Sequence, residues 1–283
     1  MEKTVQDAHS EKTIVITGAS GSMGSAAVKA LAKKGFGVIM ACRNLSKASA
    51  VRDDILREVP QAKLELAELR LDSFASIREF ARSLNDRKLY GLFNNAGVMP
   101  KDYTLTGDGY EQTIAVNYLG PFLLTHLLFP NLEGDGHVVN MVSLTCNHVK
   151  EPSDFINVRP EDSRQLHNYA ISKLALMYFS IELARREPDL NVNVADPGVV
   201  NSNMIDLGRW FDPIADAVFK PLCKNPAEGA LPAVNAMLSD RSMQLFRGDC
   251  YEPIPDKFLE RRISSAALWE QTESIFRDMY QED

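Results

Sequence analysis

The chain has 283 residues, 45% of them hydrophobic, and a formal net charge of −7. This length and composition suit one α/β domain with a large core. The acidic balance argues against nucleic acid as a main partner, because phosphate binding requires a basic face. No run of about 18 apolar residues is present, so no membrane-spanning helix is expected. The polar stretch 1–12 shows no secretory signal, and residues 1–11 are expected to form a flexible N-terminus.

The four cysteines, Cys42, Cys146, Cys223 and Cys250, are scattered along the chain without paired spacing. This distribution indicates free thiols rather than disulfides, as in a reducing compartment, and predicts a cytoplasmic protein. Cys146 lies close to His148, but two metal-binding side chains without further partners do not make a site. No bound metal is therefore expected.

A phosphate-binding turn is predicted near the N-terminus. The β-branched run 13–17 predicts a buried parallel strand that stops at Gly18. Small residues dominate positions 18–24, and the Ala-rich helix that follows ends near Gly35, after two lysines. Backbone N–H groups at the start of such a helix face the pyrophosphate in dinucleotide-binding folds.

The end of the second predicted strand, residues 37–41, bears on the choice of dinucleotide. Arg43 and Asn44 follow this strand, and no aspartate or glutamate stands there. An acidic side chain at this point holds the ribose 2′-hydroxyl of NAD, whereas an arginine suits the 2′-phosphate of NADP. NADP(H) is therefore expected, with Lys47 adding positive charge. NAD(H) is the alternative if Arg43 is only a surface residue.

Polar residues also follow the next strands. A helix over 46–59, a strand over 63–71 and a helix over 77–84 are predicted in order, and Asp72 is expected to cap the second of these helices. A strand over 89–93 then ends in Asn94-Asn95-Ala96-Gly97. Residues at the carboxyl end of a parallel strand lie where open sheets bind ligands.

A long helix over 110–129 is expected to be broken at Gly120-Pro121. Because Pro121 has no N–H, the carbonyl of Asn117 loses its helical donor and needs another partner, such as an ordered water. This predicts a site position at Asn117. The alternative is a simple packing kink.

The next two elements carry the predicted chemistry. A strand over 137–143 places Ser143 at its carboxyl end, and the irregular stretch 144–167 is expected to form one wall of a pocket. On the helix predicted over 169–186, Tyr169 and Lys173 lie one turn apart on the same face. An ammonium beside a phenol lowers the tyrosine pKa, and such a tyrosine can give or take a proton.

The remainder of the chain contains a strand over 190–195, an irregular stretch over 203–226, a helix over 227–238, a short strand at 249–251 and a helix over 266–280. The stretch 203–226 is either a mobile lid over an apolar substrate or a capped surface helix. Nothing in the composition marks a second domain. The pattern predicts a single doubly wound α/β (Rossmann) domain over 12–283, with a central parallel sheet of about seven strands and helices on both faces.

In this order the motifs resemble those of the short-chain dehydrogenase/reductase family, over roughly residues 12–280. They are Thr17-Gly18-x-x-x-x-x-Gly24, Asn94-Asn95-Ala96-Gly97, Asn117, Ser143, Tyr169-x-x-x-Lys173 and Pro197-Gly198. The chain is most similar to the branch of retinol dehydrogenase and protochlorophyllide reductase, on the runs 41–44, 106–111, 117–125, 172–175 and 268–270. The 26 positions from Ser143 to Tyr169 fit the longer insertion of that branch.

The resemblance implies roles for individual residues. Tyr169 would be the general acid and base, Lys173 would lower its pKa and hold the nicotinamide ribose, Ser143 would bind the substrate oxygen, and Asn117 would hold a relay water. The cofactor would contact Gly18, Ser20, Ser22, Met23, Gly24, Arg43, Asn44, Asp72 at the adenine, Asn95, Ala96, Gly97, Tyr169, Lys173, Pro197, Gly198, Val200 and Ser202.

Three positions depart from the family pattern. Ser22 replaces a glycine and places a Cβ where the backbone approaches the pyrophosphate. This Cβ could shift the loop or weaken binding of the cofactor. Val142 replaces a serine, which leaves the register of Ser143 unchanged. Asp196 brings a negative charge near the expected nicotinamide pocket. In addition, the retinol enzymes often carry an N-terminal membrane anchor, and the polar N-terminus here argues for a soluble enzyme.

The predicted activity is NADP(H)-dependent interconversion of a carbonyl and an alcohol on an apolar small molecule. One alternative is a protochlorophyllide-type double-bond reductase. Another is a non-catalytic, nucleotide-sensing protein of the same fold, which the retained Asn117, Ser143, Tyr169 and Lys173 argue against. The helices over 110–129 and 169–186 often pair between subunits in this family, so a homodimer or homotetramer is expected.

Overall fold

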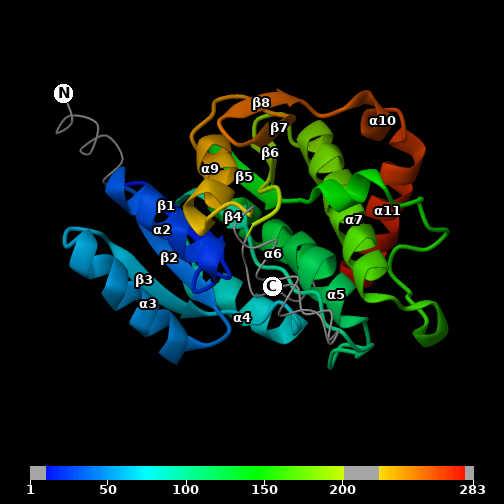
Figure 1. The fold of residues 1–283 in the computed structure, drawn as a ribbon, viewed down its shortest axis with the longest axis horizontal. Helices are drawn as coiled ribbons and strands as arrows, with labels where there is room; N and C mark the ends of the chain where they lie inside the picture. Colours follow the sequence, from blue (N-terminus) through cyan, green and yellow to red (C-terminus); the bar gives the residue numbers. More distant parts are fainter. Residues whose placement is uncertain (1–10, 201–222, 278–283) are drawn as a thin grey trace.

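One β-sheet runs through the part of the chain that this computed structural model describes, residues 11–200 and 223–277. Its order is β3-β2-β1-β4-β5-β6-β7-β8 (Figure 1). All neighbours pair in parallel except β7 and β8. The strands are β1 Thr13–Thr17, β2 Gly37–Cys42, β3 Leu64–Glu68, β4 Leu89–Asn94, β5 Leu132–Met141, β6 Asn191–Asp196, β7 Gln244–Arg247 and β8 Cys250–Pro253.

The sequence order of the strands reverses between β1 and β4, which makes their carboxyl ends the topological switch point of the sheet. This arrangement confirms the predicted doubly wound fold. One edge of the sheet differs from the prediction. A single strand at 249–251 was expected there, but β7 and β8 form an antiparallel hairpin through Gly248, which has a φ of +59°. β7 escaped prediction because its four residues include only two buried ones, too few for a visible pattern.

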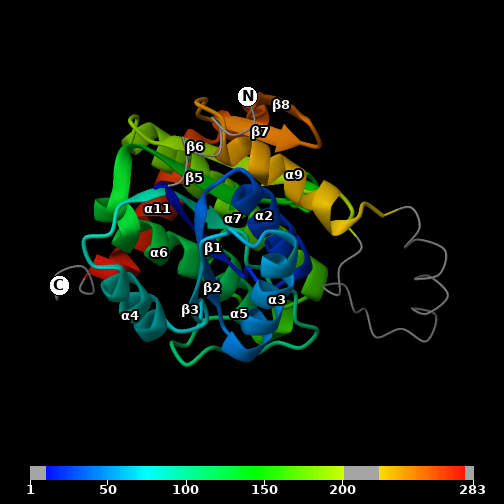
Figure 2. The ribbon, with the colours of Figure 1, turned by 90° about the vertical axis from the view of Figure 1, so that its left-hand side faces the viewer.

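Helices cover both faces of the sheet, as Figure 2 shows. One layer contains α2 (Ser22–Lys33), α3 (Leu45–Glu58) and α9 (Pro226–Met237). The other contains α4 (Phe74–Leu84), α5 (Gln112–Ile114), η1 (Ala115–Leu119), α6 (Gly120–Leu128), α7 (Gln165–Arg186) and α11 (Arg262–Phe276). The short elements η2 (Phe129–Asn131), η3 (Leu144–Asn147), η4 (Pro160–Asp162) and α10 (Asp256–Leu259) lie between them in the chain.

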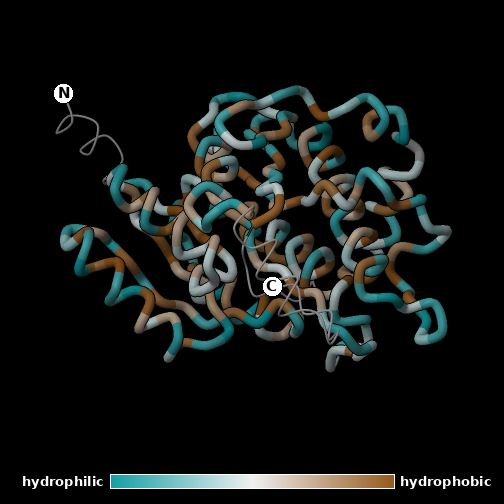
Figure 3. Tube along the Cα trace, viewed as in Figure 1, coloured by the Kyte–Doolittle hydropathy of each residue, from teal (hydrophilic) through white to brown (hydrophobic). Residues whose placement is uncertain are grey.

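The alternation of side chains along each strand explains the two layers. In β1, Ile14 and Ile16 belong to the core beneath α2 and α9, whereas Val15 belongs to the core beneath α6 and α7. Strands buried on both faces carry nearly continuous apolar residues, which is why this one was predictable. In Figure 3 the hydrophobic segments accordingly run through the interior, and the hydrophilic ones dominate the outer loops.

The predicted break at Gly120-Pro121 is wrong. The chain passes from α5 through one π-helical turn, η1, directly into α6, and the Gly120 N–H bonds to the Ala115 carbonyl five residues back. The widened turn absorbs the change of hydrogen-bonding register ahead of Pro121, so the helix continues. Gly120 is needed for close packing, because a Cβ there would lie 2.8 Å from the Leu71 carbonyl oxygen.

By length and composition alone, one helical stretch among the described residues, Gln112–Asn131, could cross a membrane. However, 78% of the tested window in this stretch is buried inside the protein. The stretch includes η1 and α6, which pack in the core. The absence of a membrane span therefore stays a prediction.

The C-terminal helix α11 covers α6 and α7. Trp269 packs its ring 5.1 Å from that of Phe122 and 5.8 Å from that of Phe179, and the Thr272 and Tyr118 hydroxyls are 2.6 Å apart. Ser265 donates a hydrogen bond of 2.7 Å to Glu182. α6 and α7 belong to the two helices, over 110–129 and 169–186, that were expected to pair between subunits. Homo-oligomerisation stays a prediction, and a subunit contact has to use surface other than that under α11.

Candidate active site

A cavity of about 630 Å³ opens at the switch point, between the carboxyl ends of β1, β2 and β4. The structure brings most of the predicted cofactor residues into its lining: Gly18, Ser20, Ser22, Met23, Gly24, Arg43, Asn44, Asp72, Asn95, Ala96 and Gly97. It also adds residues that the sequence analysis did not select, among them Thr17, Leu69, Leu71, Val98 and Val116. Thr17 is the last residue of β1 and Leu69 directly follows β3, so their positions at strand ends were available signals; Val116 lies on η1 and had none.

The turn between β1 and α2 is built by glycines where no side chain fits. Gly18 has a φ of +63°, in the left-handed region. A Cβ at Gly24 would lie 2.3 Å from the Gly18 carbonyl oxygen and 2.9 Å from the Asn95 side-chain nitrogen. No side chain caps the N-terminus of α2. Its first N–H groups therefore face the cavity without a side-chain acceptor, as an anion-binding cradle requires.

Ser22, the departure from the family pattern, is the first residue of α2 and is exposed. Gly21 before it is the N-cap, with φ −78° and ψ 167°, a conformation open to any residue. The strand-turn-helix geometry thus persists with the glycine one position early.

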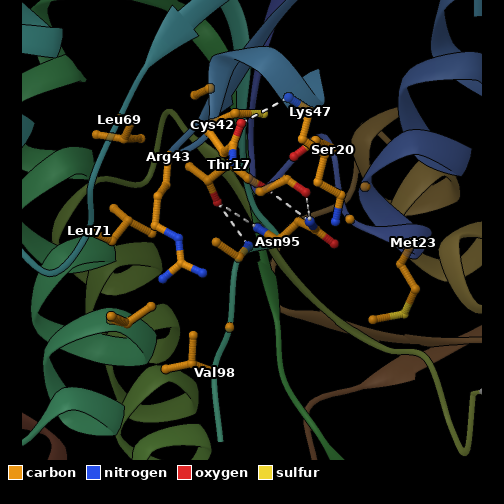
Figure 4. Close-up of a pocket in the computed structure, with 18 of the residues that line it drawn as sticks. Thr17, Ser20, Met23, Cys42, Arg43, Lys47, Leu69, Leu71, Asn95 and Val98 are labelled. Atoms are coloured by element: carbon orange, nitrogen blue, oxygen red, sulfur yellow. Dashed lines mark hydrogen bonds between the residues drawn. The ribbon is translucent and has the colours of Figure 1, made fainter. Parts of the chain in front are cut away.

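Asn95 ties β4 to the cradle. Its side-chain nitrogen donates to the Thr17 carbonyl at 2.8 Å, and its backbone N–H donates to the Thr17 hydroxyl at 3.0 Å. The same hydroxyl accepts the Ala96 N–H at 3.0 Å. These bonds hold the ends of β1 and β4 together at the floor of the cavity, drawn as dashed lines in Figure 4.

The end of β2 carries positive charge into the cavity. Figure 4 shows the Arg43 side chain reaching into the pocket on the side of Leu69 and Leu71. Asn44 caps α3, since its side-chain oxygen accepts the Lys47 N–H at 2.9 Å. Lys47 also lines the cavity. Within the lining, Asp72 is the counter-charge, and Arg43 and Lys47 are the cations.

The prediction that Asp72 caps the following helix is wrong. Ser73 is the N-cap of α4, and its hydroxyl accepts the Ser76 N–H at 3.3 Å. Asp72 instead forms an ion pair of 3.4 Å with Arg70, and its Oδ1 is buried without a hydrogen-bond partner among the described residues. A buried acceptor without a donor fits an edge of the cavity that receives a ligand N–H.

Three of the predicted catalytic residues lie together at the carboxyl end of β5. The hydroxyl of Ser143, just beyond β5, is hydrogen-bonded to that of Tyr169 on α7. Lys173 is buried on the same helix face, with its Nζ 5.7 Å from the centre of the Tyr169 ring. These residues do not line the 630 Å³ cavity. The cavity ends near Val98, where Asn117 makes the connection.

The prediction that Lys173 lowers the pKa of Tyr169 is wrong for this structure. Burial raises the pKa of Tyr169 to about 12, against the opposing effect of the Ser143 hydrogen bond. The Lys173 ammonium donates to the Met141 carbonyl at 2.8 Å instead, and burial lowers the pKa of Lys173 to about 8. The two side chains share a face as predicted, but burial penalises both charged forms.

Asn117 lies within η1 and is fully buried. Its side chain accepts the Val98 N–H at 2.8 Å and donates to the Val98 carbonyl at 2.9 Å and to the Ser172 hydroxyl at 3.0 Å. Ser172 in turn donates to the Tyr169 carbonyl at 2.7 Å. Asn117 thus links the wall of the cavity to the helix that carries Tyr169 and Lys173.

The predicted nicotinamide side of the site follows β6. Gly198 has a φ of +71°, and Val200 forms a parallel bridge with Lys224. Pro197, Gly198 and Val200 do not line the 630 Å³ cavity. Ser202 and residues 203–222 of the expected lid lie outside the described residues.

All four cysteines are free thiols in the structure. Burial is the main cause that raises the pKa of Cys146 to about 11, so this thiol is unreactive near neutral pH. In residues 11–200 and 223–277 no group of three or more His, Cys, Asp or Glu side chains is placed to hold a metal ion.

A doubly wound sheet with a phosphate cradle at its switch point, next to a serine-tyrosine-lysine cluster, defines an oxidoreductase of the nicotinamide-dinucleotide class. A model of the short chain dehydrogenase family matches residues 12–208. The chain therefore belongs to the short-chain dehydrogenase/reductase family.

Relatives, including the following two human proteins, place the chain in the retinol dehydrogenase-like branch of this family. Retinol dehydrogenase 13 is 34% identical over 257 residues, which cover 84% of this chain and 76% of the relative. Polyprenol dehydrogenase is 34% identical over 241 residues, which cover 81% and 73% of the two chains.

Solved structures share the fold of this chain. An uncharacterised protein from Mycobacterium paratuberculosis is 29% identical with a TM-score of 0.72, over 94% of this chain and 93% of that one. A short chain dehydrogenase from Shigella flexneri, complexed with NADP, is 21% identical with a TM-score of 0.66, over 87% and 100% of the two chains. The second likeness shows the fold alone.

Proposed function

We propose that this protein is an NADP(H)-dependent oxidoreductase that interconverts a carbonyl and an alcohol on an apolar substrate. The observation that carries the proposal is the hydrogen-bonded Ser143–Tyr169 pair beside buried Lys173, linked through Asn117 to the dinucleotide-sized cavity. Each of the four side chains comes from a different element or helical turn, and packing brings them to one end of the sheet.

The cavity fits a nicotinamide dinucleotide on three observations. The glycine cradle leaves no room for a Cβ at Gly24, the N-terminus of α2 lacks a side-chain cap, and the Oδ1 of Asp72 is an unused acceptor. Gly18, Met23 and Gly24 would hold the pyrophosphate, and Asp72 the adenine. When bound, the cofactor supplies or accepts the hydride.

The protein's own residues handle the proton. With its pKa near 12, the Tyr169 phenol is protonated at neutral pH and can donate its proton to a carbonyl oxygen during reduction. The Ser143 hydroxyl holds that oxygen beside the phenol. In the oxidation of an alcohol, Tyr169 takes the proton as the base. Lys173, whose buried ammonium donates to the Met141 carbonyl, would hold the nicotinamide ribose, as the family resemblance implies.

The preference for NADP(H) is supported by Arg43 and Lys47 in the cavity lining and by the lack of an acidic residue directly after β2. A guanidinium matches the geometry of a phosphate and forms charge-assisted hydrogen bonds with it.

The apolar substrate is supported by three exposed apolar side chains close in sequence to site residues. Leu144 follows Ser143, Leu166 precedes Tyr169 by one helical turn, and Val199 follows Gly198; they are 41%, 54% and 65% exposed. Exposed apolar side chains beside a polar catalytic pair suit an apolar ligand with one oxygen. Retinol and polyprenol, named in the relatives, are alcohols of this chemistry.

The test is an assay of NADPH oxidation with retinal, a long-chain alkenal and a small hydrophilic aldehyde, followed by product analysis. The expected product is the alcohol, and turnover falls ~100- to 10,000-fold in Tyr169→Phe. Tyr178→Phe is the matched control, because Tyr178 lies on the same helix, buried and bonded to Arg261, away from Ser143. A saturated aldehyde as product would establish a double-bond reductase, and tight NADPH binding without any turnover a nucleotide sensor.

A further inference from the structure

We propose that Arg247, which belongs to none of the motifs above, is a positioning residue for the reaction. Through Asp196, it fixes the turn over 196–200 and neutralises a buried carboxylate next to Tyr169. The inference rests on the proposed function, since the reaction is the main readout of its test.

The carboxylate of Asp196 closes the turn that follows β6. Its side chain is only 3% exposed, and its Oδ1 accepts the Gly198 N–H at 3.0 Å. Gly198 takes its positive φ within this turn. Asp196 therefore holds the backbone on the expected nicotinamide side of the site, and an aspartate at this place is one of the departures from the family pattern.

Arg247 supplies the counter-charge from the neighbouring strand. It stands directly opposite Asp196 in the pairing of β6 with β7, and its Nε donates to Oδ2 of Asp196 at 3.2 Å. Its Nη1 donates to Glu252 on β8 at 3.0 Å. Arg247 and Glu252 are 40% and 53% exposed, whereas Asp196 is buried. Removing Arg247 would thus leave a buried charge without compensation.

The far end of the turn is fixed as well. The Val199 carbonyl accepts the Lys224 N–H at 2.9 Å, and a Cβ at Gly229 would lie 2.6 Å from Val200 and 3.3 Å from the Met23 sulfur. Met23 is in the first turn of α2, within the cofactor cradle. A shift at Asp196 would therefore be transmitted along a turn whose other end packs near the cradle.

Asp196 also acts on the reacting groups through its charge. Burial is the main cause of the raised pKa of both Tyr169 and Cys146, and the Asp196 carboxylate adds to both; Arg247 opposes the effect at Cys146. Several polar and titratable groups of the described residues lie around the Tyr169 phenol and the Cys146 thiol. They are Ser143 beyond β5, Lys173 on α7, Asp196 on β6, Arg247 on β7 and Lys257 on α10. Without Arg247, the phenol would face an unpaired carboxylate and would be harder to ionise.

The test compares wild type, Arg247→Met, the double variant Asp196→Asn/Arg247→Met and Arg241→Met. Asparagine keeps an acceptor for the Gly198 N–H without the charge. Arg241 stacks on Tyr251 at the same edge of the sheet, so its variant controls for the loss of an arginine there. Alcohol oxidation, which needs Tyr169 as the base, is followed as a function of pH, together with nucleotide affinity and the melting temperature.

Arg247→Met is expected to lower kcat/KM about tenfold and to shift the pH profile of kcat/KM upward by about half a unit or more. The double variant is expected to restore most of kcat/KM and most of the profile. Arg241→Met is expected to match wild type. A profile and kcat/KM of Arg247→Met equal to those of wild type, with only the melting temperature lowered, would overturn the proposal in favour of a sheet-edge ion pair.

Failure of the proposed function shows separately, because wild type itself would then turn over no substrate. In that case the affinity for the nucleotide tests whether Arg247 positions the turn. An affinity about fivefold or more weaker in Arg247→Met, and recovered in the double variant, supports the positioning role. Equal affinities of wild type and Arg247→Met overturn it.

Discussion

The side-chain amide of Asn117 forms two hydrogen bonds with the backbone of Val98: Oδ1 accepts the Val98 N–H at 2.8 Å, and Nδ2 donates to the Val98 carbonyl at 2.9 Å. The pairing imitates one rung of a sheet between a π-helical turn and the loop after β4. It connects the cavity wall to the catalytic helix through Ser172. Asn117 therefore acts at least partly as a structural clamp, beyond the water-holding role that the family resemblance implies.

Asn117→Ala should lower the free energy of unfolding by about 2–4 kcal/mol, because it leaves buried backbone groups of Val98 without partners. It should also weaken nucleotide binding, since Val98 lines the cavity. Chemical denaturation and nucleotide titration measure the two effects. Asn131→Ala is the control: this buried asparagine bonds to the carbonyls of Asn85 and Arg87 and does not line the cavity, so only stability should fall.

Arg43→Ala should raise the Kd for NADPH by ~10- to 100-fold and that for NADH by less than about twofold, because only NADPH carries the 2′-phosphate. Fluorescence titration of the nicotinamide measures both. Arg52→Ala removes a cation from α3 that is bonded to Asp53 and does not line the cavity, and it should change neither affinity. An equal loss of affinity for NADPH and NADH in Arg43→Ala would show that Arg43 binds a part of the cofactor that both nucleotides contain.

Lys173 should impose a pH dependence on stability. Burial lowers its pKa in the folded chain from 10.5 to about 8, so between these values the unfolded chain holds more protons. Stability from this group is complete above pH 10.5 and is lost as the pH falls through 8. In that window the free energy of unfolding should rise by up to about 1 kcal/mol per pH unit.

The comparison with Lys173→Met isolates this contribution. Tyr169 and Cys146 have raised pKa values, so they bind protons more tightly in the folded chain and act in the opposite direction at higher pH. The difference between wild type and variant from pH 8 to 9 is therefore the diagnostic quantity. Parallel stability curves for the two proteins would show that Lys173 ionises as freely as in the unfolded chain.

Trp269→Ala should destabilise the protein by about 3–5 kcal/mol, because it removes the ring that packs against Phe122, His126 and Phe179. Trp269→Phe should cost much less, since the indole Nε1 has no hydrogen-bond partner among the described residues. Glu270→Ala, which breaks an exposed ion pair with Arg186, should cost less than about 1 kcal/mol. A melting temperature of Trp269→Ala equal to that of Glu270→Ala would mean that α11 does not stabilise the α6–α7 face.

Local patterns were enough for much of the fold. β1, β4 and β6 carry β-branched or apolar runs that stop at Gly18, Asn94 and Asp196, and the apolar run of β2 stops at Arg43; such runs are buried in a doubly wound sheet. The cradle glycines and the i,i+4 spacing of Tyr169 and Lys173 are also properties of short segments. Most of the predicted cofactor residues consequently line one cavity.

Where the predictions failed, long-range packing overrode the local signal. Asp72 resembles a helix cap, but Ser73 takes that role, and the distant Asp108 accepts the Phe74 N–H at the start of the helix at 2.9 Å. Gly120-Pro121 resembles a helix break, but the core holds η1 and α6 in one continuous helix. The tyrosine pKa was inferred from one neighbour on the same helix, whereas burial beneath the surrounding elements controls it.

The sequence by itself determined the order of the strands and helices up to β6, the phosphate cradle and the i,i+4 pair of Tyr169 and Lys173, because each depends on residues a few positions apart. Only the tertiary structure decided how α11 covers α6 and α7, how Asn117 clamps Val98 and how Arg247 meets Asp196 across 51 positions of the chain. These contacts join segments whose separation in sequence carries no periodic signal. Their geometry exists only after the sheet has assembled and brought the segments together.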